Sequence, residues 1–353
     1  RARGGYQTLE KVLLLMRPEE VTQEVATSGI LGHGGAAFPA GRKWGVIKLN
    51  DEQPHYLCAN ADEGEPGTFK DRVYLERDPH RFIEGALIAA WAVGIETIYV
   101  YLRDEYHGCR GMLEAELKRL RADPPVQGMP EIILRRGAGA YICGEESAMI
   151  ESIEGKRGMP RLRPPYVAQV GLFGRPTLEH NFETLHWVRD ILEKGGAWFS
   201  SFGRNGRKGL RSFSVSGRVK EPGVKLAPAG ITIQELIDEY CGGMQDGHLY
   251  GSLIDILRNG ELAGTVDLRD AEQRLLLDHE RQVFLAVALL RVQVEHPGDQ
   301  GSLKTSTRAL QHVKARAAQL DPAFADLGVV AVGQSQDQLV NLGALGGAHD
   351  LRR

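Results

Sequence analysis

A glycine-rich segment near the middle of the chain, residues 136–147, combines residue types that suit cofactor binding. It follows an apolar, strand-like run at residues 132–134 and comes directly before a helical pattern that begins at Ala148. Glycines between a strand and a helix let backbone amides approach a ligand closely, and the helix N-terminus adds partial positive charge. Two carboxylates at the helix start, Glu145 and Glu146, suit hydrogen bonds to sugar-like hydroxyl groups better than contact with phosphate. The glycine spacing differs from the dinucleotide pattern G-x-G-x-x-G, so this segment alone does not predict a standard NAD-binding turn.

Two other loops also contain residue types that suit ligand binding. The first, residues 32–41, is rich in glycine, and the second, residues 60–67, is acidic. An acidic run is most often a solvated surface loop, but this one follows a strand-like run at residues 56–59, and that place favours a site. The basic, proline-rich residues 156–165 are typical of a loop that is solvated or that contacts a partner chain or nucleotide phosphates.

Strand-like and helical patterns alternate around these loops, which argues for a parallel sheet with the ligand at the carboxyl ends of its strands. We predict strands at residues 56–59, 98–102 and 132–134, and helices at residues 9–16, 18–28, 78–93, 110–121 and 182–194. Asp78 followed by Pro79 is a good N-cap and first turn for one of these helices.

The pattern changes in the second half of the chain. Residues 212–217 and a Pro222-Gly223 turn predict a hairpin, and residues 232–240 predict a short helix, so this region is a small β-rich domain with one helix. From about residue 280 the apolar residues recur at helical spacing, which predicts a C-terminal helical bundle.

Composition excludes several classes of protein. The 353 residues, 42% hydrophobic and 25% charged, are ordinary for a soluble globular protein of two or three domains. A net charge of −3 implies no general affinity for nucleic acid. We see no apolar run long enough to span a bilayer and no signal-peptide pattern, and the sequence begins with Arg1, as expected where N-terminal residues are missing or removed. The cysteines lie far apart without a C-x-x-C pair, which argues against disulfides and a self-contained metal site and favours a reducing compartment: Cys58, Cys109, Cys143 and Cys241.

Taken together, the three loops resemble those of the NADH- and FMN-binding 51 kDa subunit of respiratory complex I, and of the similar diaphorase subunits of NAD-linked hydrogenases and formate dehydrogenases. The matching stretches are residues 32–44, 60–72, 137–155 and 160–184, with weaker similarity to about residue 248. The resemblance implies an α/β fold of four parts: an N-terminal helical segment with the glycine loop (1–40), a Rossmann-like FMN- and NADH-binding domain (41–201), a small ubiquitin-like β-grasp domain (202–280) and a C-terminal helical bundle (281–353).

The resemblance also implies which residues bind the cofactors. FMN would be held by Gly32, Gly34, Gly35, Lys43, Asn60, Asp62, Glu63, Tyr141, Gly144 and Glu145, with His180, Asn181 and Thr184 near its phosphate. NADH would stack on the flavin beside Phe38, Glu65, Glu146 and Tyr166, of which Glu65 and Glu146 lie nearest the chemistry. Hydride transfer needs no protein acid or base, because the cofactors carry the chemistry and the protein fixes their distance and angle.

The implied function is that of an FMN-dependent NADH dehydrogenase subunit, which passes electrons to a centre on an iron–sulfur partner subunit of a larger redox complex. Such a subunit would lie on the cytoplasmic or mitochondrial matrix side, peripheral to a membrane complex and without inserting into the membrane. Two alternatives stay open: a redox-inactive structural or regulatory paralogue within such a complex, and a free-standing NADH diaphorase. The sequence does not separate NAD from NADP.

Departures from the family pattern accompany the matches. His33 stands where the family usually has Arg, Ala37 where it has Gly, and His180 where it has the first of two Asn residues. The family carries C-terminal cysteines, spaced C-x-x-C-x-x-C with a fourth further on, that bind a [4Fe–4S] cluster. Here the aligned positions hold Pro297, Gln300 and Leu303, with the fourth near Val330, so we expect no cluster and no other metal in this chain.

Overall fold

The computed structural model describes residues 5–35, 37–47, 54–248 and 250, and the backbone of three strands beyond them, β7 (Leu253–Arg258), β8 (Glu261–Asp267) and β9 (Val329–Val330). The chain divides into two compact units, residues 1–214 with 224–230, and residues 215–223 with 231–353. No helix of the described residues has the length and apolar character needed to cross a membrane.

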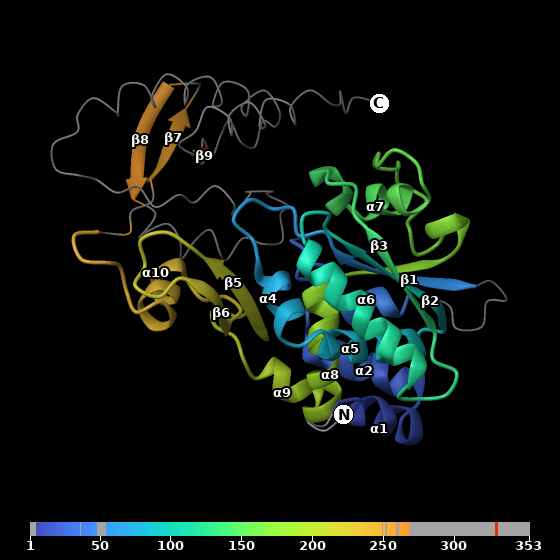
Figure 1. Ribbon diagram of the computed structural model, residues 1–353. Helices are drawn as coiled ribbons and strands as arrows, with labels where there is room; N and C mark the ends of the chain where they lie inside the picture. Colours follow the sequence, from blue (N-terminus) through green and yellow to red (C-terminus); the bar gives the residue numbers. More distant parts are fainter. Residues whose placement is uncertain are drawn as a thin grey trace. The chain divides into compact units, whose positions relative to one another are not determined.

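The first unit alternates strands and helices along the chain (Figure 1). Its elements are α1 (Gln7–Leu15), α2 (Pro18–Ser28), α3 (Ala40–Trp44), β1 (His55–Ala61), α4 (Lys70–Arg77), α5 (Pro79–Ala92), β2 (Ile95–Leu102), α6 (His107–Ala122), β3 (Glu131–Arg136), η1 (Tyr141–Gly144), α7 (Glu146–Ile153), η2 (Leu172–Gly174), β4 (Thr177–Asn181), α8 (Phe182–Lys194) and α9 (Gly196–Ser200). Strands β5 (Leu210–Val215) and β6 (Gly223–Pro228) form a two-stranded sheet.

Four parallel strands form the central sheet, in the order β3-β2-β1-β4. The prediction of a parallel sheet is therefore confirmed, and so are the strands predicted at β1, β2 and β3. Strand β4 was not predicted. The strand order reverses between β1 and β4, and in such sheets ligands bind in the crevice outside the carboxyl ends of the strands at that point.

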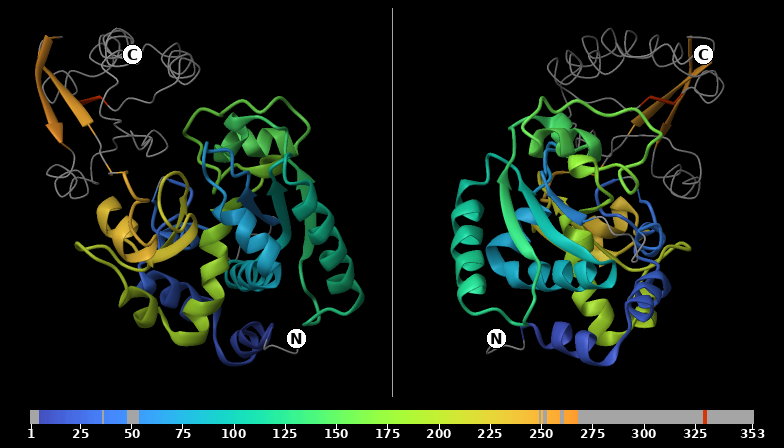
Figure 2. Two further views of the ribbon diagram at one scale, coloured as in Figure 1. Left: turned by 60° about the vertical axis from the view of Figure 1, so that its left-hand side comes forward. Right: turned by 90° about the vertical axis from the view of Figure 1, so that its right-hand side faces the viewer.

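Helices cover both faces of this sheet. Alternate residues of each strand point to opposite faces, so each face packs into a core of its own. Leu57 and Ala59 of β1 belong to the large core that includes residues of α1, α2, α5, α6 and α8. Cys58 belongs to a second core, with Met149 and Ile150 of α7. Figure 2 gives two further views of these layers.

Helix α5 begins as the sequence predicts. The Asp78 side chain accepts a hydrogen bond from the Arg81 backbone N–H (3.3 Å), and Pro79 occupies the first turn. The helix packs against α8, where the rings of Phe82 and Phe182 stack with centroids 4.3 Å apart. This contact fixes the direction of α8, whose first turn lies at the carboxyl edge of β4.

The second unit contains a small helical segment. Helix α10 (Ile233–Glu235), capped by Thr232, is followed by a π-helical turn, η3 (Leu236–Tyr240). The predicted short helix is therefore confirmed. Its apolar core consists of Val219, Ile237, Cys241 and Tyr250. Strands β7, β8 and β9 form an antiparallel sheet in the order β8-β7-β9.

Parts of the sequence-based prediction stay untested. The β-grasp assignment and the domain limits at residues 40, 201 and 280 remain predictions. The helices of the expected C-terminal bundle lie outside the described residues, as do Pro297, Gln300 and Leu303. The expected absence of an iron–sulfur cluster therefore also stays a prediction.

Candidate functional site

The candidate site lies where the strand order of the sheet reverses. Asn60, near the end of β1, is the register partner of Asn181, the last residue of β4. The acidic loop follows β1, and α8 follows β4 directly. The Asn181 side chain caps α8 by accepting a hydrogen bond from the Glu183 N–H (2.9 Å). A helix N-terminus at this position favours a negatively charged ligand group.

The three loops singled out in the sequence lie side by side at this edge. The Asn60 side-chain amide donates a hydrogen bond to the Gly144 carbonyl (2.9 Å), which joins the acidic loop to the loop before α7. Gly34 lies against Asn181, since a Cβ at Gly34 would be 3.3 Å from the Asn181 Cβ. A Cβ at Gly64 would similarly be 3.3 Å from the Tyr141 ring. Both glycines permit a close approach that a larger residue would oppose.

The glycine loop presents open backbone to the site. A hydrogen bond from Gly32 N–H to the Phe38 carbonyl (2.9 Å) closes the loop. Gly35 has a φ of 109°, and none of the described atoms lies within 4 Å of the position that its Cβ would take. This backbone conformation and the free space together suit direct contact with a ligand.

Lys43 supplies one of the cationic groups of the site. Its Nζ lies 2.8 Å from a carboxylate oxygen of Glu179 on β4 and 3.3 Å from one of Glu146 on α7. Burial lowers the pKa of Lys43, but the two carboxylates outweigh burial and raise it. Arg163, on the basic loop, forms ion pairs with both Glu145 and Glu146. Cations and carboxylates therefore alternate along this side of the site.

Asp62 leaves a hydrogen-bonding oxygen unused. Its Oδ2 atom is buried and has no hydrogen-bond partner among the described residues. Burial, together with the nearby Glu105, raises the pKa of the Asp62 carboxyl to about 6. An unsatisfied buried oxygen costs free energy, and a bound hydroxyl or N–H donor would remove that cost. Asp62 is therefore placed to receive a ligand donor.

Three aromatic side chains predicted to bind cofactors are well exposed, at 48% for Phe38, 60% for Tyr141 and 57% for Tyr166. The Arg42 guanidinium lies over the Phe38 ring, 5.8 Å from its centroid. Burial and a hydrogen bond with Glu65 raise the pKa of Tyr141 to about 12, so its hydroxyl is neutral at physiological pH. Exposed rings of this kind suit stacking on a planar heterocycle.

Glu63 and Glu145 have structural partners inside the fold. The Glu63 carboxylate accepts hydrogen bonds from the backbone N–H groups of Asp71 (3.1 Å) and Arg72 (3.3 Å), and from the Tyr106 hydroxyl (2.9 Å). It therefore holds the start of α4. Glu145 caps α7 by accepting hydrogen bonds from the backbone N–H groups at positions 147 and 148. Their predicted contacts with a flavin stay predictions.

His180 and Thr184 are buried below the site. The Trp44 indole N–H donates a hydrogen bond to Nε2 of His180 (2.7 Å), and burial, with the nearby Lys43, lowers the pKa of His180 well below its usual value. The Thr184 hydroxyl accepts a hydrogen bond from the His33 N–H (3.0 Å). Both residues support the loops that face the site, and their predicted contact with a ligand is untested.

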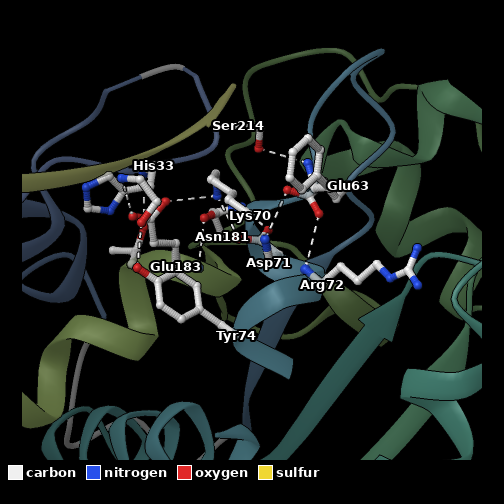
Figure 3. A network of polar contacts seen from close by, with 12 residues as sticks. His33, Glu63, Lys70, Asp71, Arg72, Tyr74, Asn181, Glu183 and Ser214 are labelled. Atoms are coloured by element: carbon white, nitrogen blue, oxygen red, sulfur yellow. Dashed lines mark hydrogen bonds and ion pairs between the residues drawn. The ribbon is translucent and has the colours of Figure 1, made fainter. Parts of the chain in front are cut away.

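A buried polar network lies beside these loops (Figure 3). The Lys70 Nζ contacts Asp71 (2.6 Å) and Glu183 (3.0 Å). Burial raises the pKa of Asp71 to about 7, because Glu63 and Glu183 add to burial and together outweigh the opposing effect of Lys70. For Glu183 the balance is reversed: burial raises its pKa, but Lys70 outweighs burial and lowers it to about 2.

This network predicts a pH-dependent stability. Because the folded protein holds the Asp71 proton more tightly than the unfolded chain does, Asp71 contributes stability below its unfolded pKa, and that contribution is lost as the pH rises through about 7. We expect the wild-type free energy of unfolding, relative to that of Asp71→Asn, to fall between about pH 4 and about pH 7 and to level off above that. Urea denaturation of both proteins across this range measures the difference. A pH-independent difference would contradict the assignment.

Four residues of this region were missed in the sequence: Lys70, Asp71, Arg163 and Glu179. Glu179 lies on β4, the strand of the central sheet that was not predicted. Lys70 and Asp71 belong to a run of charges that is typical of a solvated helix face. Arg163 was predicted only in part: it lies on the basic loop, and contact with nucleotide phosphates was one of the predictions for that loop. The other three have long-range partners that a single sequence does not reveal.

Comparison with known proteins decides the family. A sequence profile described as the Nuo51 FMN-binding domain matches residues 25–190, and a profile for the SLBB domain matches residues 212–263. A subunit of an NADH-quinone oxidoreductase of Rhizobium meliloti is 42% identical over 279 residues, which are 75% of this chain and 66% of the relative. The 51 kDa subunit of the mitochondrial NADH-ubiquinone oxidoreductase of Neurospora crassa is 41% identical over 71% of this chain and 52% of its own length. The chain belongs to the family of the complex I 51 kDa subunit.

A solved hydrogenase structure matches a similar share of this chain. A crystal structure of NAD⁺-reducing [NiFe]-hydrogenase in the H₂-reduced state matches with a TM-score of 0.66 and 36% identity, over 76% of this chain and 46% of the hydrogenase chain. The present chain thus spans less than two thirds of each of these three relatives.

Proposed function

We propose that the site binds FMN and NADH and that the protein is an NADH-oxidising flavoprotein subunit. The single observation that carries this proposal is the meeting of the three loops at the reversal point of a parallel sheet, in a chain whose residues 25–190 match an FMN-binding domain.

The residues at the site fit a flavin mononucleotide. The N-terminus of α8 and the Lys43 ammonium offer positive charge for a phosphate. The unpaired Asp62 oxygen accepts a hydrogen bond from a ribityl hydroxyl or a ring N–H. Gly34 and Gly35 allow close contact, and the exposed rings of Phe38 and Tyr166 suit the stacking of flat heterocycles.

When bound, FMN supplies the chemistry of hydride acceptance from NADH. The chain's own residues bind and orient the two cofactors, and no side chain needs to exchange a proton with the substrate. Glu65 lies on the acidic loop and Glu146 is the first residue of α7, and we assign both to the orientation of the dinucleotide. Arg163 and Lys43 hold the Glu146 carboxylate from two directions, which limits its motion.

The electrons would leave for an iron–sulfur centre on a partner subunit. Two relatives are named as subunits of NADH oxidoreductases that act on a quinone, and the matching crystal structure is that of an NAD⁺-reducing hydrogenase. Since we expect no [4Fe–4S] cluster in this chain, with Pro297, Gln300 and Leu303 at the positions that we align with the family's cysteines, we propose that the first acceptor beyond FMN lies on another chain. We place the protein on the cytoplasmic or matrix side, peripheral to its complex.

Binding of FMN by the purified chain tests the proposal. We expect equimolar FMN to be bound, with quenched flavin fluorescence, and riboflavin to be bound much more weakly because it lacks the phosphate that Lys43 would meet. Failure of FMN to bind would favour the alternative of a redox-inactive paralogue, which the lost cysteines motivate. Size-exclusion chromatography of native extract distinguishes a component of a large complex from a free-standing diaphorase.

A further inference from the structure

Lys70, the first residue of α4, is buried although it carries a charge. Its exposure is 8%, and its ammonium lies between the carboxylates of Asp71 and Glu183. Both contacts are close enough to be charge-assisted hydrogen bonds. The Lys70 side chain is more deeply buried than that of Lys43 (11% against 21% exposed), and both of its carboxylate partners lie within 3.0 Å, so we assign Lys70 a structural role around the site rather than contact with a ligand.

On one side, Lys70 is connected to the acidic loop. The Glu63 carboxylate binds the backbone N–H groups of Asp71 and Arg72, so the end of the loop and the start of α4 form one rigid piece. At the same junction the Phe69 N–H donates a hydrogen bond to the Ser214 hydroxyl (2.9 Å). A shift of the α4 start would therefore move the loop that carries Asp62 and Glu65.

On the other side, Lys70 is connected to the first turn of α8. Glu183 lies in that turn, and its carboxylate also accepts a hydrogen bond from the Ser212 N–H (3.0 Å). The Asn181 amide contacts Asp71 (3.4 Å) while its oxygen caps α8. Gly34 of the glycine loop lies against the same Asn181 side chain. Two loops of the site and the α8 N-terminus thus meet at one network.

We propose that Lys70 is a positioning residue for the flavin site, whose ammonium fixes the acidic and glycine loops to the first turn of α8. This inference rests on the proposed function. Three carboxylates, from Glu63, Asp71 and Glu183, gather around a single ammonium (Figure 3). Without that ammonium the carboxylates repel one another or take up protons, and the α4 start separates from α8.

The test compares FMN binding by wild type, Lys70→Met and Lys70→Arg. Arg77→Met is the matched control, because Arg77 is an exposed cation on the same helix. We expect Lys70→Met to raise the Kd for FMN at least about tenfold, Lys70→Arg to recover part of the loss, and Arg77→Met to bind as wild type does. Flavin fluorescence quenching gives the Kd, and circular dichroism checks that each variant is folded.

A second variant decides the question if Lys70→Met does not fold. Asp71→Asn keeps the size of the side chain and replaces its ionisable carboxyl group by a neutral amide. The charged and polar groups that face Asp71 are Lys70, Asn181, Glu63 and Glu183. We expect this variant and wild type to have equal FMN affinity at about pH 6, where Asp71 is mostly protonated, and different affinities at about pH 8. A purely structural role of the network would not produce this pH-dependent ratio.

The outcomes separate this inference from the proposed function. If wild type binds no FMN, the proposed function fails. If wild type binds FMN and a folded Lys70→Met binds it equally well, the positioning role of Lys70 is overturned. If Lys70→Met is unfolded and the affinity ratio of Asp71→Asn to wild type is constant with pH, the inference is overturned as well.

Discussion

Replacement of Lys43 by methionine is expected to remove nearly all FMN binding. The substitution leaves Glu179 and Glu146, both partly or largely buried, without the cation that lies between them. Glu146 would keep its ion pair with Arg163, but no other cation of the described residues pairs with Glu179, so the negative charge beside the proposed phosphate position would increase. In the proposed complex Lys43 and the flavin phosphate form a charge pair between protein and ligand. Removal of one partner of such a buried pair costs roughly 2–5 kcal/mol of binding free energy, so we expect the Kd for FMN to rise about a hundredfold or more.

The measurement is the Kd of FMN and of riboflavin for the same set of variants. Lys11→Met serves as the control, because Lys11 is an exposed lysine on α1. Since riboflavin has no phosphate, its weak binding should change far less than that of FMN. A Lys43→Met protein that binds FMN with wild-type affinity would show that Lys43 has no part in the site.

Replacement of Gly85 by alanine is expected to have the largest effect on stability. Gly85 lies in the middle of α5, and a Cβ there would be 2.0 Å from the Leu185 carbonyl oxygen of α8 and 3.4 Å from the Val188 Cβ. A backbone atom cannot rotate away, so α8 has to move. We expect a loss of about 3 kcal/mol or more in the free energy of unfolding, because overpacking in a dense core is costly.

Gly111→Ala on α6 is the matched control. Gly111 is exposed and helical, and among the described residues no atom lies within 4 Å of its Cβ position. Alanine should therefore raise stability there by about 0.5–1 kcal/mol through helix propensity. Urea denaturation of both variants gives the comparison. Equal stabilities would contradict the close packing of α5 against α8.

The sequence predicted most of the sheet but not β4, and the reason is physical. Apolar runs identify β1, β2 and β3, which contribute Leu57, Ile98 and Ile132 to the core. Strand β4 ends in Glu179, His180 and Asn181, and each of these polar side chains has a hydrogen-bond partner at the site. A strand that supplies the site thus departs from the apolar pattern by which strands are recognised.

The acidic loop shows a similar limit. The sequence indicates that the loop faces a ligand, but neighbouring carboxylates cannot be told apart without tertiary contacts. Asp62 keeps a buried oxygen without a described partner, whereas Glu63 holds the start of α4 and the Tyr106 hydroxyl. Lys70 belongs to a charged helix and would be expected in solvent. Its burial depends on Glu183, more than a hundred positions away, and local patterns do not contain that information.

An anaerobic titration with NADH tests the central claim most directly. The chain is loaded with FMN, free flavin is removed, and the visible absorbance of the bound flavin is followed as NADH is added. We predict that the flavin band is bleached in proportion to the added NADH, and that the Lys70→Met and Lys43→Met proteins retain too little flavin to show the change. Bound flavin that keeps its colour in excess NADH, or a wild-type chain that retains no flavin, would contradict the account.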